Sequence, residues 1–326
     1  MKKSYIRFTF FSLLMMISTL LYNCTPSEDD GQIKIAGIVF QEDQFFRMIE
    51  LGMQESAEKH GINLLTGNSS NSIDREISLI DSYIAGRVDA IVVSPLSTKA
   101  SIPALKRASD SGIKIITYNT TVESDIPVCY IESDQFDLGA STGREVRDYI
   151  NNNLGGSAKI AMIEFISQSP EQGKQRVDGF KSVVGEMDGV EIAAEQDAWL
   201  VQQAADVVEQ LLTAHPDLDI IWAANEGGTV GAAIGVKNTG NTGKVVVFGT
   251  DMSEQLADFL LSEDNILQAV TGQKPFDIGS LAVDNAVKIM KTESVDNKIS
   301  LPGILFTRRK SAEISEYKER LKALSK

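Results

Sequence analysis

Polar and aromatic residues follow several apolar runs of the sequence, at positions where they could bind a small polar ligand. They are Phe45 and Phe46 after 33–39, Asn119 and Thr120 after 113–118, Asn225 after 220–224, and Asp251 after 245–249. If these runs are parallel strands of one sheet, their carboxyl ends meet at the edge where open α/β sheets bind ligands. The pattern therefore predicts a binding site at this edge.

Each of these residues also has a simpler explanation. Asn225 could cap the helix that follows it, and Asp251 could form a turn. Phe46 could belong to the core, and Arg176 could lie on a solvated helix surface. What favours a site is that such residues recur at the same point of successive strand–helix units, which capping alone does not require.

The sequence lacks the usual patterns of an enzyme site. Its two histidines, His60 and His215, precede a glycine and a proline, and neither has metal ligands at the usual spacing. A phosphate-binding G-x-x-x-x-G-K-[ST] motif does not occur, and Gly228, Gly231 and Gly235 have the wrong spacing for a dinucleotide motif. We expect no enzyme and no cofactor, although catalysis by carboxylates alone stays formally open.

The elements that would position the site are short strands alternating with amphipathic helices. Apolar, β-branched runs occur at 33–39, 90–93, 113–118, 159–163, 220–222 and 245–248. Nearly continuous runs of this length are typical of strands buried on both faces. Segments with apolar residues three and four apart lie between them. The alternation predicts an α/β fold with parallel sheets, and two similar series run before and after about residue 135.

The chain ends in a segment of a different kind. Residues 311–326 place Ile314, Tyr317, Leu321 and Leu324 on one stripe among charged residues. This spacing predicts a terminal helix that packs on its own protein or, as the less favoured alternative, on a partner.

The first residues are typical of export from the cytoplasm. Lys2, Lys3 and Arg7 lead into an apolar run at 8–21. Such a run is too short to cross a hydrocarbon core of roughly 30 Å, so we interpret residues 1–23 as a cleaved signal peptide.

The residues around Cys24 refine this interpretation. Leu21-Tyr22-Asn23-Cys24 resembles the lipobox of bacterial lipoproteins, although Tyr22 and Asn23 replace the small residues usual there. The resemblance implies lipidation at Cys24 and a tether over 24–31, with ordinary secretion as the alternative. Either way, we expect the protein to act outside the cytoplasm; the lipidated form would lie in the periplasm or at the cell surface and touch the membrane only through its lipid.

Charge and cysteine content limit the partners. Loss of residues 1–23 removes three of the 31 basic residues and none of the 45 acidic ones, so the formal net charge falls from −14 to −17. Such a charge repels phosphate backbones, and we expect no nucleic-acid partner. Cys129 is the only cysteine besides Cys24, so a lipidated chain has no internal disulfide.

Ordered segments along most of the chain resemble the type I periplasmic sugar-binding proteins, with the ribose-binding pattern the most similar. They are Phe45-Phe46 leading to Gly52 and Ala57, 89–95 (DAIVVSP), 176–180 (RVDGF), 211–217 (LLTAHPD), 224–226 (ANE), 249–251 (GTD) and 273–275 (QKP). The family implies two similar three-layer αβα lobes with parallel sheets, joined by a three-strand hinge. We expect one lobe at 32–133 plus 274–303, the other at 134–273 plus 304–312, and a terminal helix at 313–326. The crossings are expected near Ser133, near Met252 or shortly before it, and near 273–275.

The resemblance also implies roles for the site residues. Phe46 matches a ring that stacks on the sugar, and Arg176, Asn225, Asp251 and Gln273 match residues that bind its hydroxyl groups. Trp199 would be a second ring, with Leu200 in the alternative register. The remaining expected ligand-binding residues are Asp43, Phe45, Asn119 and Thr120.

Departures from the ribose-binding pattern bear on the ligand. Asn119 and Thr120 replace an Asp-Arg pair, and Asp43 replaces an asparagine. We therefore expect a monosaccharide or related polyol rather than ribose itself. An oxygen-rich calcium loop is not found, so no metal is expected.

The family implies a monomeric lipoprotein that closes on its ligand about a hinge and delivers it to an ABC permease. The alternative is a lipoprotein that presents its ligand to a chemoreceptor or sensor kinase, and the neighbouring genes would separate the two. A transcriptional regulator, which shares this fold, is disfavoured by the export signal and by the lack of an N-terminal DNA-binding motif.

Overall fold

The computed structural model describes residues 32–324. The expected signal peptide at 1–23, the lipidation site Cys24 and the tether at 24–31 lie outside the described residues. Among the helices of the described part, none has the length and apolar character needed to cross a membrane.

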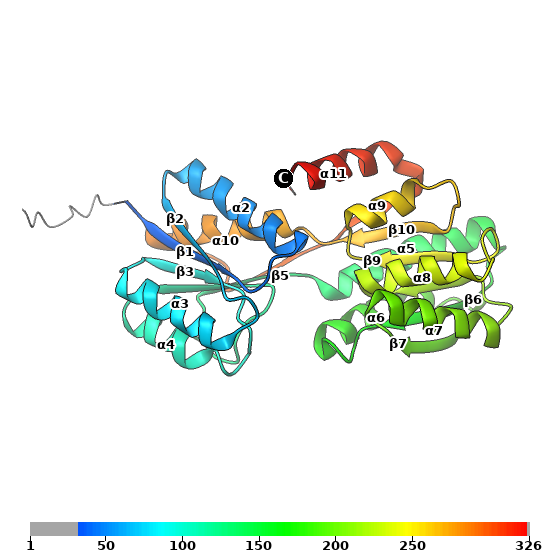
Figure 1. Ribbon diagram of the computed structural model, residues 1–326, viewed down its shortest axis with the longest axis horizontal. Coiled ribbons are helices and arrows are strands. Elements are labelled where there is room, and N and C mark those ends of the chain that lie inside the picture. Colours follow the sequence, from blue (N-terminus) through cyan, green and yellow to red (C-terminus); the bar gives the residue numbers. More distant parts are fainter. Residues whose placement is uncertain (1–31, 325–326) are drawn as a thin grey trace, which may run out of the picture. The chain divides into compact units, whose positions relative to one another are not determined.

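The first lobe is built on a parallel sheet of six strands in the order β11-β5-β4-β3-β1-β2 (Figure 1). Its strands are β1 (Lys34–Val39), β2 (Asn63–Asn68), β3 (Ala90–Val93), β4 (Lys114–Tyr118), β5 (Cys129–Ser133) and β11 (Lys298–Leu301). Its helices are α2 (Gln44–His60), α3 (Ile73–Ala85), α4 (Ile102–Asp110) and α10 (Pro275–Met290). Strands β1 and β3 are almost fully buried, as the apolar runs predict.

The second lobe has a sheet of six strands in the order β12-β10-β9-β8-β6-β7, in which only β12 is antiparallel to its neighbour. Its strands are β6 (Ala158–Glu164), β7 (Val190–Asp197), β8 (Ile220–Ala223), β9 (Val246–Thr250), β10 (Leu267–Gly272) and β12 (Ile304–Thr307). Its helices are α5 (Gln135–Asn153), α6 (Pro170–Val184), α7 (Val201–Ala214), α8 (Glu226–Asn238), α9 (Glu254–Leu261), a 3₁₀ turn (Arg308–Lys310) and α11 (Ser311–Leu324). Two mostly parallel sheets with helices confirm the predicted α/β class.

The chain passes between the lobes three times: after β5, between β10 and α10, and between β11 and β12. The expected crossing near Met252 is wrong. Strands β9 and β10, on either side of that residue, pair in the same sheet, with Gly249 opposite Val270. The third passage instead lies at Pro302 and Gly303, just before the antiparallel strand β12.

Close helix packing in each lobe depends on a pair of glycines. A Cβ atom at Gly139 of α5 would lie 1.9 Å from the carbonyl oxygen of Arg176 on α6, so the two backbones touch. Gly179 makes the reciprocal contact with α5 at 2.0 Å. Gly52 and Gly279 bring α2 and α10 together in the same way, each with a backbone oxygen at 2.0 Å. The two lobes thus repeat one packing device.

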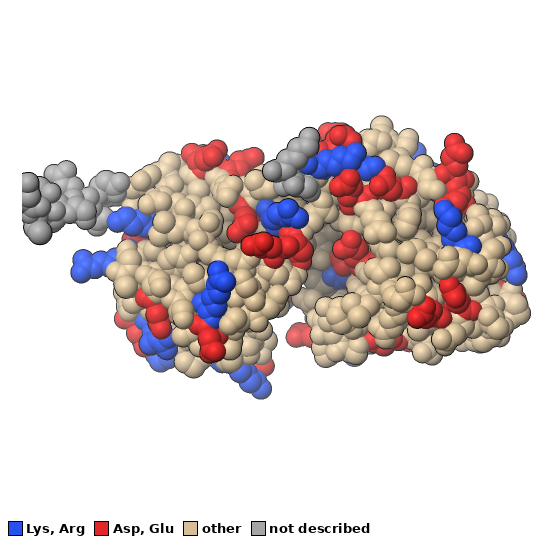
Figure 2. Space-filling model, in the orientation of Figure 1, with Lys and Arg blue, Asp and Glu red and all other residues tan. Residues whose placement is uncertain are grey.

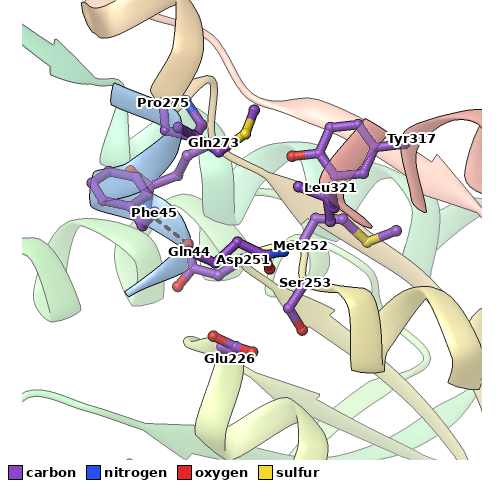
Figure 3. A pocket seen from close by; sticks show the side chains of 11 residues that line it. Gln44, Phe45, Glu226, Asp251, Met252, Ser253, Gln273, Pro275, Tyr317 and Leu321 are labelled. Atoms are coloured by element: carbon purple, nitrogen blue, oxygen red, sulfur yellow. Dashed lines mark hydrogen bonds between the residues drawn. The ribbon is translucent and has the colours of Figure 1, made fainter. Parts of the chain in front are cut away.

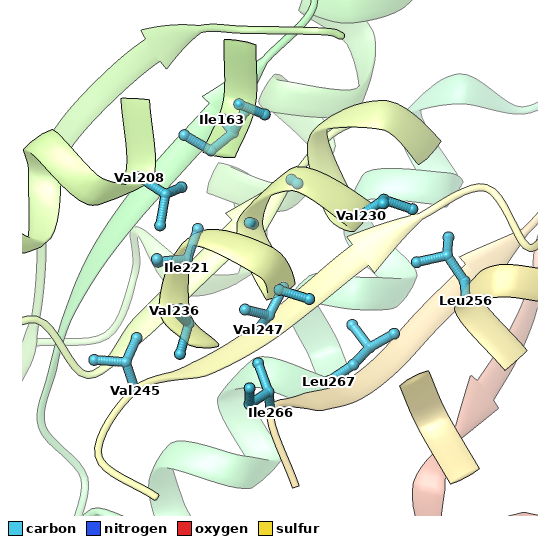
Figure 4. Close-up of a cluster of buried hydrophobic side chains, with 14 of the residues drawn as sticks. Ile163, Val208, Ile221, Val230, Val236, Val245, Val247, Leu256, Ile266 and Leu267 are labelled. Carbon is cyan, nitrogen blue, oxygen red and sulfur yellow. The ribbon is translucent and has the colours of Figure 1, made fainter. Parts of the chain in front are cut away.

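The larger core cluster of the second lobe fills the space between its sheet and α7, α8 and α9 (Figure 4). It contains Ile221, Val247 and Leu267 from the strands and Val208 and Leu256 from the helices. On the opposite face, the rings of Phe180 and Trp222 stack at 4.3 Å. Burial of these apolar groups, rather than surface charge, supplies most of the stability.

The terminal helix packs on the second lobe, next to α9 (Figure 1). Ile314 is fully buried in the core cluster, and the ring of Tyr317 lies 4.6 Å from that of Phe306. The side chain of Leu324 lies outside the described part of the structure. The apolar stripe of this helix is therefore used within the protein itself.

Acidic and basic side chains are interspersed on the face shown in Figure 2. In a typical pair, Lys106 and Asp110, the charged groups are 2.8 Å apart and both side chains are exposed. Exposed pairs contribute about 0–1 kcal/mol each, so they affect solubility more than folding.

Candidate ligand-binding cleft

A cleft of about 400 Å³ is lined by residues from both lobes, at the carboxyl ends of the strands. Its volume lies in the range of roughly 300–1,000 Å³ that is usual for small-molecule sites. Nine of the ten expected ligand-binding residues line it: Asp43, Phe45, Phe46, Asn119, Arg176, Trp199, Asn225, Asp251 and Gln273. Leu200, the alternative to Trp199, also lines it.

Thr120 is the expected residue that does not line the cleft. Its hydroxyl donates to the carbonyl oxygen of Pro95 at 2.8 Å and lies 3.2 Å from the hydroxyl of Ser94. These bonds fix the loop after β4 to the loop after β3. The side chain of Thr120 therefore supports the neighbouring residue Asn119 rather than facing the cleft.

A buried ion pair occupies the floor of the cleft in the second lobe. Arg176 is 3% exposed, and its Nη1 donates to Asp251 Oδ2 and to the carbonyl oxygen of Ala224, both at 2.8 Å. Its Nε donates to Gln135 Oε1 at 2.7 Å, and its guanidinium carbon lies 4.9 Å from the centre of the Phe165 ring. Arg176 is thus not a solvated surface residue, because four groups fix its position.

The network continues from Asp251 to the segments that join the lobes. Gln273 Nε2 donates to Asp251 Oδ1 at 2.8 Å, while Ser133 Oγ donates to Gln273 Oε1 at 2.7 Å. Ser133 ends β5 and Gln273 follows β10, so each lies at a passage between lobes. Both oxygens of Asp251 are therefore engaged before any ligand arrives.

Asn119 and Asp251 share an unusual backbone conformation at corresponding places in the two lobes. Their φ angles are 59° and 67°, in the left-handed region, and each follows a central strand. Asn119 N donates to Ile131 O and Asp251 N donates to Thr271 O, both at 2.9 Å. Asparagine and aspartate tolerate this region better than most residues. Such strain is concentrated at functional sites.

Two further residues of the cleft, Asn225 and Asp43, act as helix caps. For Asn225, this is the simpler explanation that the sequence offered. Asn225 Oδ1 accepts from Gly228 N at 3.1 Å, and its Nδ2 donates to Trp199 O at 3.0 Å. Asp43 Oδ1 accepts from Phe46 N at 2.9 Å at the start of α2. These side chains place Trp199 and Phe46 at the cleft in addition to lining it.

The aromatic residues of the cleft differ in exposure. Phe46 is 3% exposed, with its ring centre 4.4 Å from that of Phe40 and 5.3 Å from that of Phe45. Phe45 and Trp199 are only partly buried. A ligand would therefore meet Phe45 and Trp199 more fully, while Phe46 supports Phe45 from behind.

Sequence reasoning missed several residues that line the cleft: Phe40, Gln41, Phe165, Gln168, Gln172, Val201, Glu226 and Gly227. Gln168 lies in the loop after β6, much as Asn225 follows β8, so the same strand-end signal applied to it, whereas Gln172 lies within α6. Gln172 Nε2 reaches from α6 of the second lobe to Asn119 O of the first at 3.5 Å, a weak contact across the cleft.

Glu226 has a perturbed pKa. Burial raises the pKa of its carboxyl group above the usual range, and the Asp251 and Asp43 carboxylates raise it further, while a hydrogen bond with Ser253 opposes this. In the sequence, Glu226 belongs to the segment 224–226 that resembles the family and follows the expected cap Asn225, but no role in binding was expected for it. Its proximity to two other carboxylates comes from the fold.

The arrangement suits binding rather than catalysis. It offers carboxylate, guanidinium and amide groups beside aromatic rings. Among residues 32–324, no cluster of three or more His, Cys, Asp or Glu side chains is arranged to hold a metal ion. A ring with hydroxyl groups and an apolar C–H face would use each of these groups.

Comparisons with known proteins agree with this architecture. Residues 37–294 match the model of the periplasmic binding protein domain. An ABC transporter periplasmic-binding protein of Escherichia coli is 28% identical over 304 residues, which cover 90% of this chain and 92% of that protein. The ribose import binding protein of the same organism is 29% identical over 264 residues, covering 78% and 83%.

A solved structure is similar in fold. The periplasmic solute-binding protein of an ABC transporter from Actinobacillus succinogenes, with bound D-allose, aligns with a TM-score of 0.76 and 26% identity. The alignment covers 86% of this chain and all of that one. These relatives are solute-binding proteins and not enzymes.

Proposed function

This chain belongs to the periplasmic binding proteins, as a type I sugar-binding member, and we propose that it binds a monosaccharide or related polyol in the cleft for delivery to an ABC importer. We further propose that it is anchored outside the cytoplasm by lipid at Cys24. One observation carries the ligand proposal. The hydrogen-bonded residues Arg176, Asp251 and Gln273 line the same cleft as two partly exposed rings, those of Phe45 and Trp199.

The chemistry of a sugar explains why these groups occur together. Its C–H face packs on an aromatic ring, and its hydroxyl groups pair with carboxylate, guanidinium and amide groups that bind two hydroxyls at once. In a dry cleft, a sugar that lacks one hydroxyl leaves a buried partner unpaired, at about 1–3 kcal/mol. Specificity would therefore be set by which hydroxyl groups meet Asp251, Arg176 and Gln273.

The relatives support the ligand class without fixing its identity. One is named for ribose import, and another was solved with bound D-allose. In this chain the loop after β4 carries Asn119 and Thr120, and only Asn119 lines the cleft. We therefore propose a polyhydroxylated ring other than ribose.

Hinge closure is the proposed mechanism. Phe45 and Asn119 come from the first lobe and Arg176 and Asn225 from the second, so a bound sugar would contact both. A ligand can favour closure only if it binds the closed form better than the open one, and contacts from both lobes supply that difference. The closed form would then be the one recognised by the permease.

The packing of the terminal helix does not favour the sensory alternative. A sensory lipoprotein could use this helix to dock on its receptor, whereas Ile314 and Tyr317 pack on the protein itself. Delivery to an importer is therefore the function we favour.

The test of sugar binding is thermal unfolding of residues 25–326 with pentoses, hexoses, deoxysugars and polyols. A ligand that binds only the folded state stabilises it by RT ln(1 + [L]/Kd). We expect a shift with one or two of these compounds. Phe45→Ala should weaken their binding about tenfold, and Phe136→Ala, which removes a ring that is 47% exposed elsewhere, serves as the matched control.

The proposal fails if no sugar or polyol raises the midpoint. It also fails if Phe45→Ala and Phe136→Ala bind every active compound equally well. Anchoring is tested separately, by labelling cells with a fatty acid and comparing the natural chain with Cys24→Ala. Label on both proteins would exclude Cys24 as the lipid site.

A further inference from the structure

A second cavity, of about 150 Å³, adjoins the cleft, and helix α11 forms one of its walls (Figure 3). We call it the annexe. Four residues line both the cleft and the annexe: Phe45, Glu226, Asp251 and Gln273. The two spaces therefore meet at the residues that we propose bind the sugar.

The rest of the annexe wall is mainly apolar. Its apolar part consists of Met48, Met252, Pro275, Tyr317 and Leu321, with Gln44 and Ser253 as the remaining polar members. The cleft has aromatic rings as well, but more of its lining consists of charged and amide groups. The apolar share of the lining is therefore larger in the annexe than in the cleft.

Helix α11 is firmly attached where it forms this wall. Ile314 is fully buried, and Leu321 is 1% exposed. Lys318 forms an ion pair with Asp258 of α9. The guanidinium carbon of Arg320 lies 4.7 Å from the centre of the Phe276 ring, at the start of α10. The wall is therefore built from ordered packing on both α9 and α10.

Tyr317 supplies a polar group in this apolar wall. Figure 3 shows its hydroxyl turned towards the cavity. The hydroxyl makes no hydrogen bond with any other residue of 32–324. Burial raises the pKa of Tyr317 to about 12, so it stays a neutral hydroxyl that can donate one hydrogen bond to a ligand oxygen.

Size and polarity indicate what the annexe can accept. A hydroxyl group of a free sugar that pointed at Met48, Met252 and Leu321, away from the Tyr317 hydroxyl, would lose its water partners without gaining others. An apolar group in the same place would be removed from water favourably. A dry cavity of about 150 Å³ in another protein is large enough for benzene. A methyl group or a single aromatic ring therefore matches the space.

We propose that the ligand is a monosaccharide or cyclitol carrying one small apolar substituent, between a methyl group and a phenyl ring in size, and that the annexe binds this substituent. The inference rests on the proposed function, because the cleft must bind the hydroxylated ring. The substituent would pass between Phe45 and Asp251, with α11 closing the far side.

The test compares each sugar or cyclitol with its own methyl ethers and its methyl and phenyl glycosides, in both anomeric forms. Binding to residues 25–326 is measured by titration calorimetry. We expect at least one derivative to bind tenfold or more tightly than its parent compound. This comparison needs no variant, so it does not depend on the folding of one.

Variants then locate the substituent. Leu321→Trp fills the annexe from α11, and we expect it to weaken the preferred derivative at least tenfold, more than it weakens the parent. Glu316→Trp adds the same ring on the exposed side of the helix and should leave the preference intact. If Leu321→Trp does not melt cooperatively, Met252→Phe fills the annexe from the segment that follows β9.

The outcomes separate the two proposals. If parent compounds bind and no derivative binds more tightly, the annexe is not a subsite and the proposed function stands. The same conclusion follows if filling the annexe leaves the preference unchanged. If neither parents nor derivatives bind, the proposed function itself fails.

Discussion

Replacing Asp251 with asparagine tests whether the buried network at the cleft floor depends on its ion pair. The change keeps the size of the side chain and the tolerance of a φ of 67°. Within residues 32–324, it removes the only carboxylate paired with Arg176, whose other acceptors there are the neutral oxygens of Ala224 and Gln135. The guanidinium would then be a buried charge without an ionic partner.

The magnitude follows from the exposure of the two groups. Removing one partner of a fully buried ion pair costs about 3–5 kcal/mol. The Arg176 side chain is 3% exposed but that of Asp251 is 23% exposed, so water can partly replace the lost charge. We therefore expect a loss of about 2 kcal/mol, or a midpoint lower by about 3 °C for a chain of this length.

The assay is thermal unfolding without ligand, followed by circular dichroism. The matched control is Asp178→Asn, because Asp178 pairs with Lys174 on the same helix as Arg176, with side chains that are 48% and 69% exposed. Such a pair contributes about 0–1 kcal/mol. Arg176→Met, alone and with Asp251→Asn, completes a double-mutant cycle that measures the coupling directly.

The reasoning is refuted if Asp251→Asn lowers the unfolding midpoint no more than Asp178→Asn does. It is also refuted by a double variant whose loss equals the sum of the two single losses. Either result would mean that Arg176 is satisfied by its neutral acceptors and that Asp251 is free to bind ligand without structural cost.

Three further predictions follow from the same structure. Gly179→Ala should lower the free energy of unfolding by about 1–3 kcal/mol, because the added Cβ would lie 2.0 Å from the carbonyl oxygen of Phe136. An unchanged unfolding midpoint would contradict the close contact between the helices. Burial and the Glu195 carboxyl group raise the pKa of Glu164 from 4.5 to about 7. The stability that Glu164 contributes is complete below pH 4.5 and is lost as the pH rises through 7. The unfolding midpoint of the natural protein should therefore fall, relative to that of Glu164→Gln, between pH 5 and 8. A constant difference between the two midpoints over this range would count against the prediction. Burial raises the pKa of Cys129 to about 11, so its thiol should resist a disulfide reagent at pH 8 until the protein unfolds, and rapid modification of the native protein would show otherwise.

Six of the strands inside the two sheets could be predicted from the sequence, whereas the interior strands β5 and β10 and the edge strands were missed. Strands β1, β3 and β8 are buried on both faces and read as continuous apolar runs. Edge strands β2 and β7 are largely exposed, and their sequences NLLTGN and VEIAAEQD lack such a run. Their pairing with β1 and β6 follows from the sheet rather than from their own composition.

The site was predictable to the extent that topology alone determines it. Residues placed after parallel strands, such as Asn119 and Asp251, reach the carboxyl edge of their own sheet whatever their packing. Which ring faces the ligand depends instead on packing: Phe46 is covered by Phe40, and this leaves Phe45 more exposed. The annexe depends on Tyr317 and Leu321, which lie far along the chain from Met48 and meet it only in the folded protein.

The network at the cleft floor gives a physical route from ligand to hinge. Gln273 bonds Asp251 and also accepts from Ser133, and Gln135 bonds Arg176 and donates to the carbonyl oxygen of Ser133 at 3.2 Å. The same few side chains thus contact the ligand space and two of the three passages between lobes. A sugar hydroxyl that bonds Asp251 or Gln273 must share oxygens and amide protons already used there. In the proposed function, ligand binding would therefore change the bonds that fix the passages, and a difference in these bonds between open and closed forms is what closure requires.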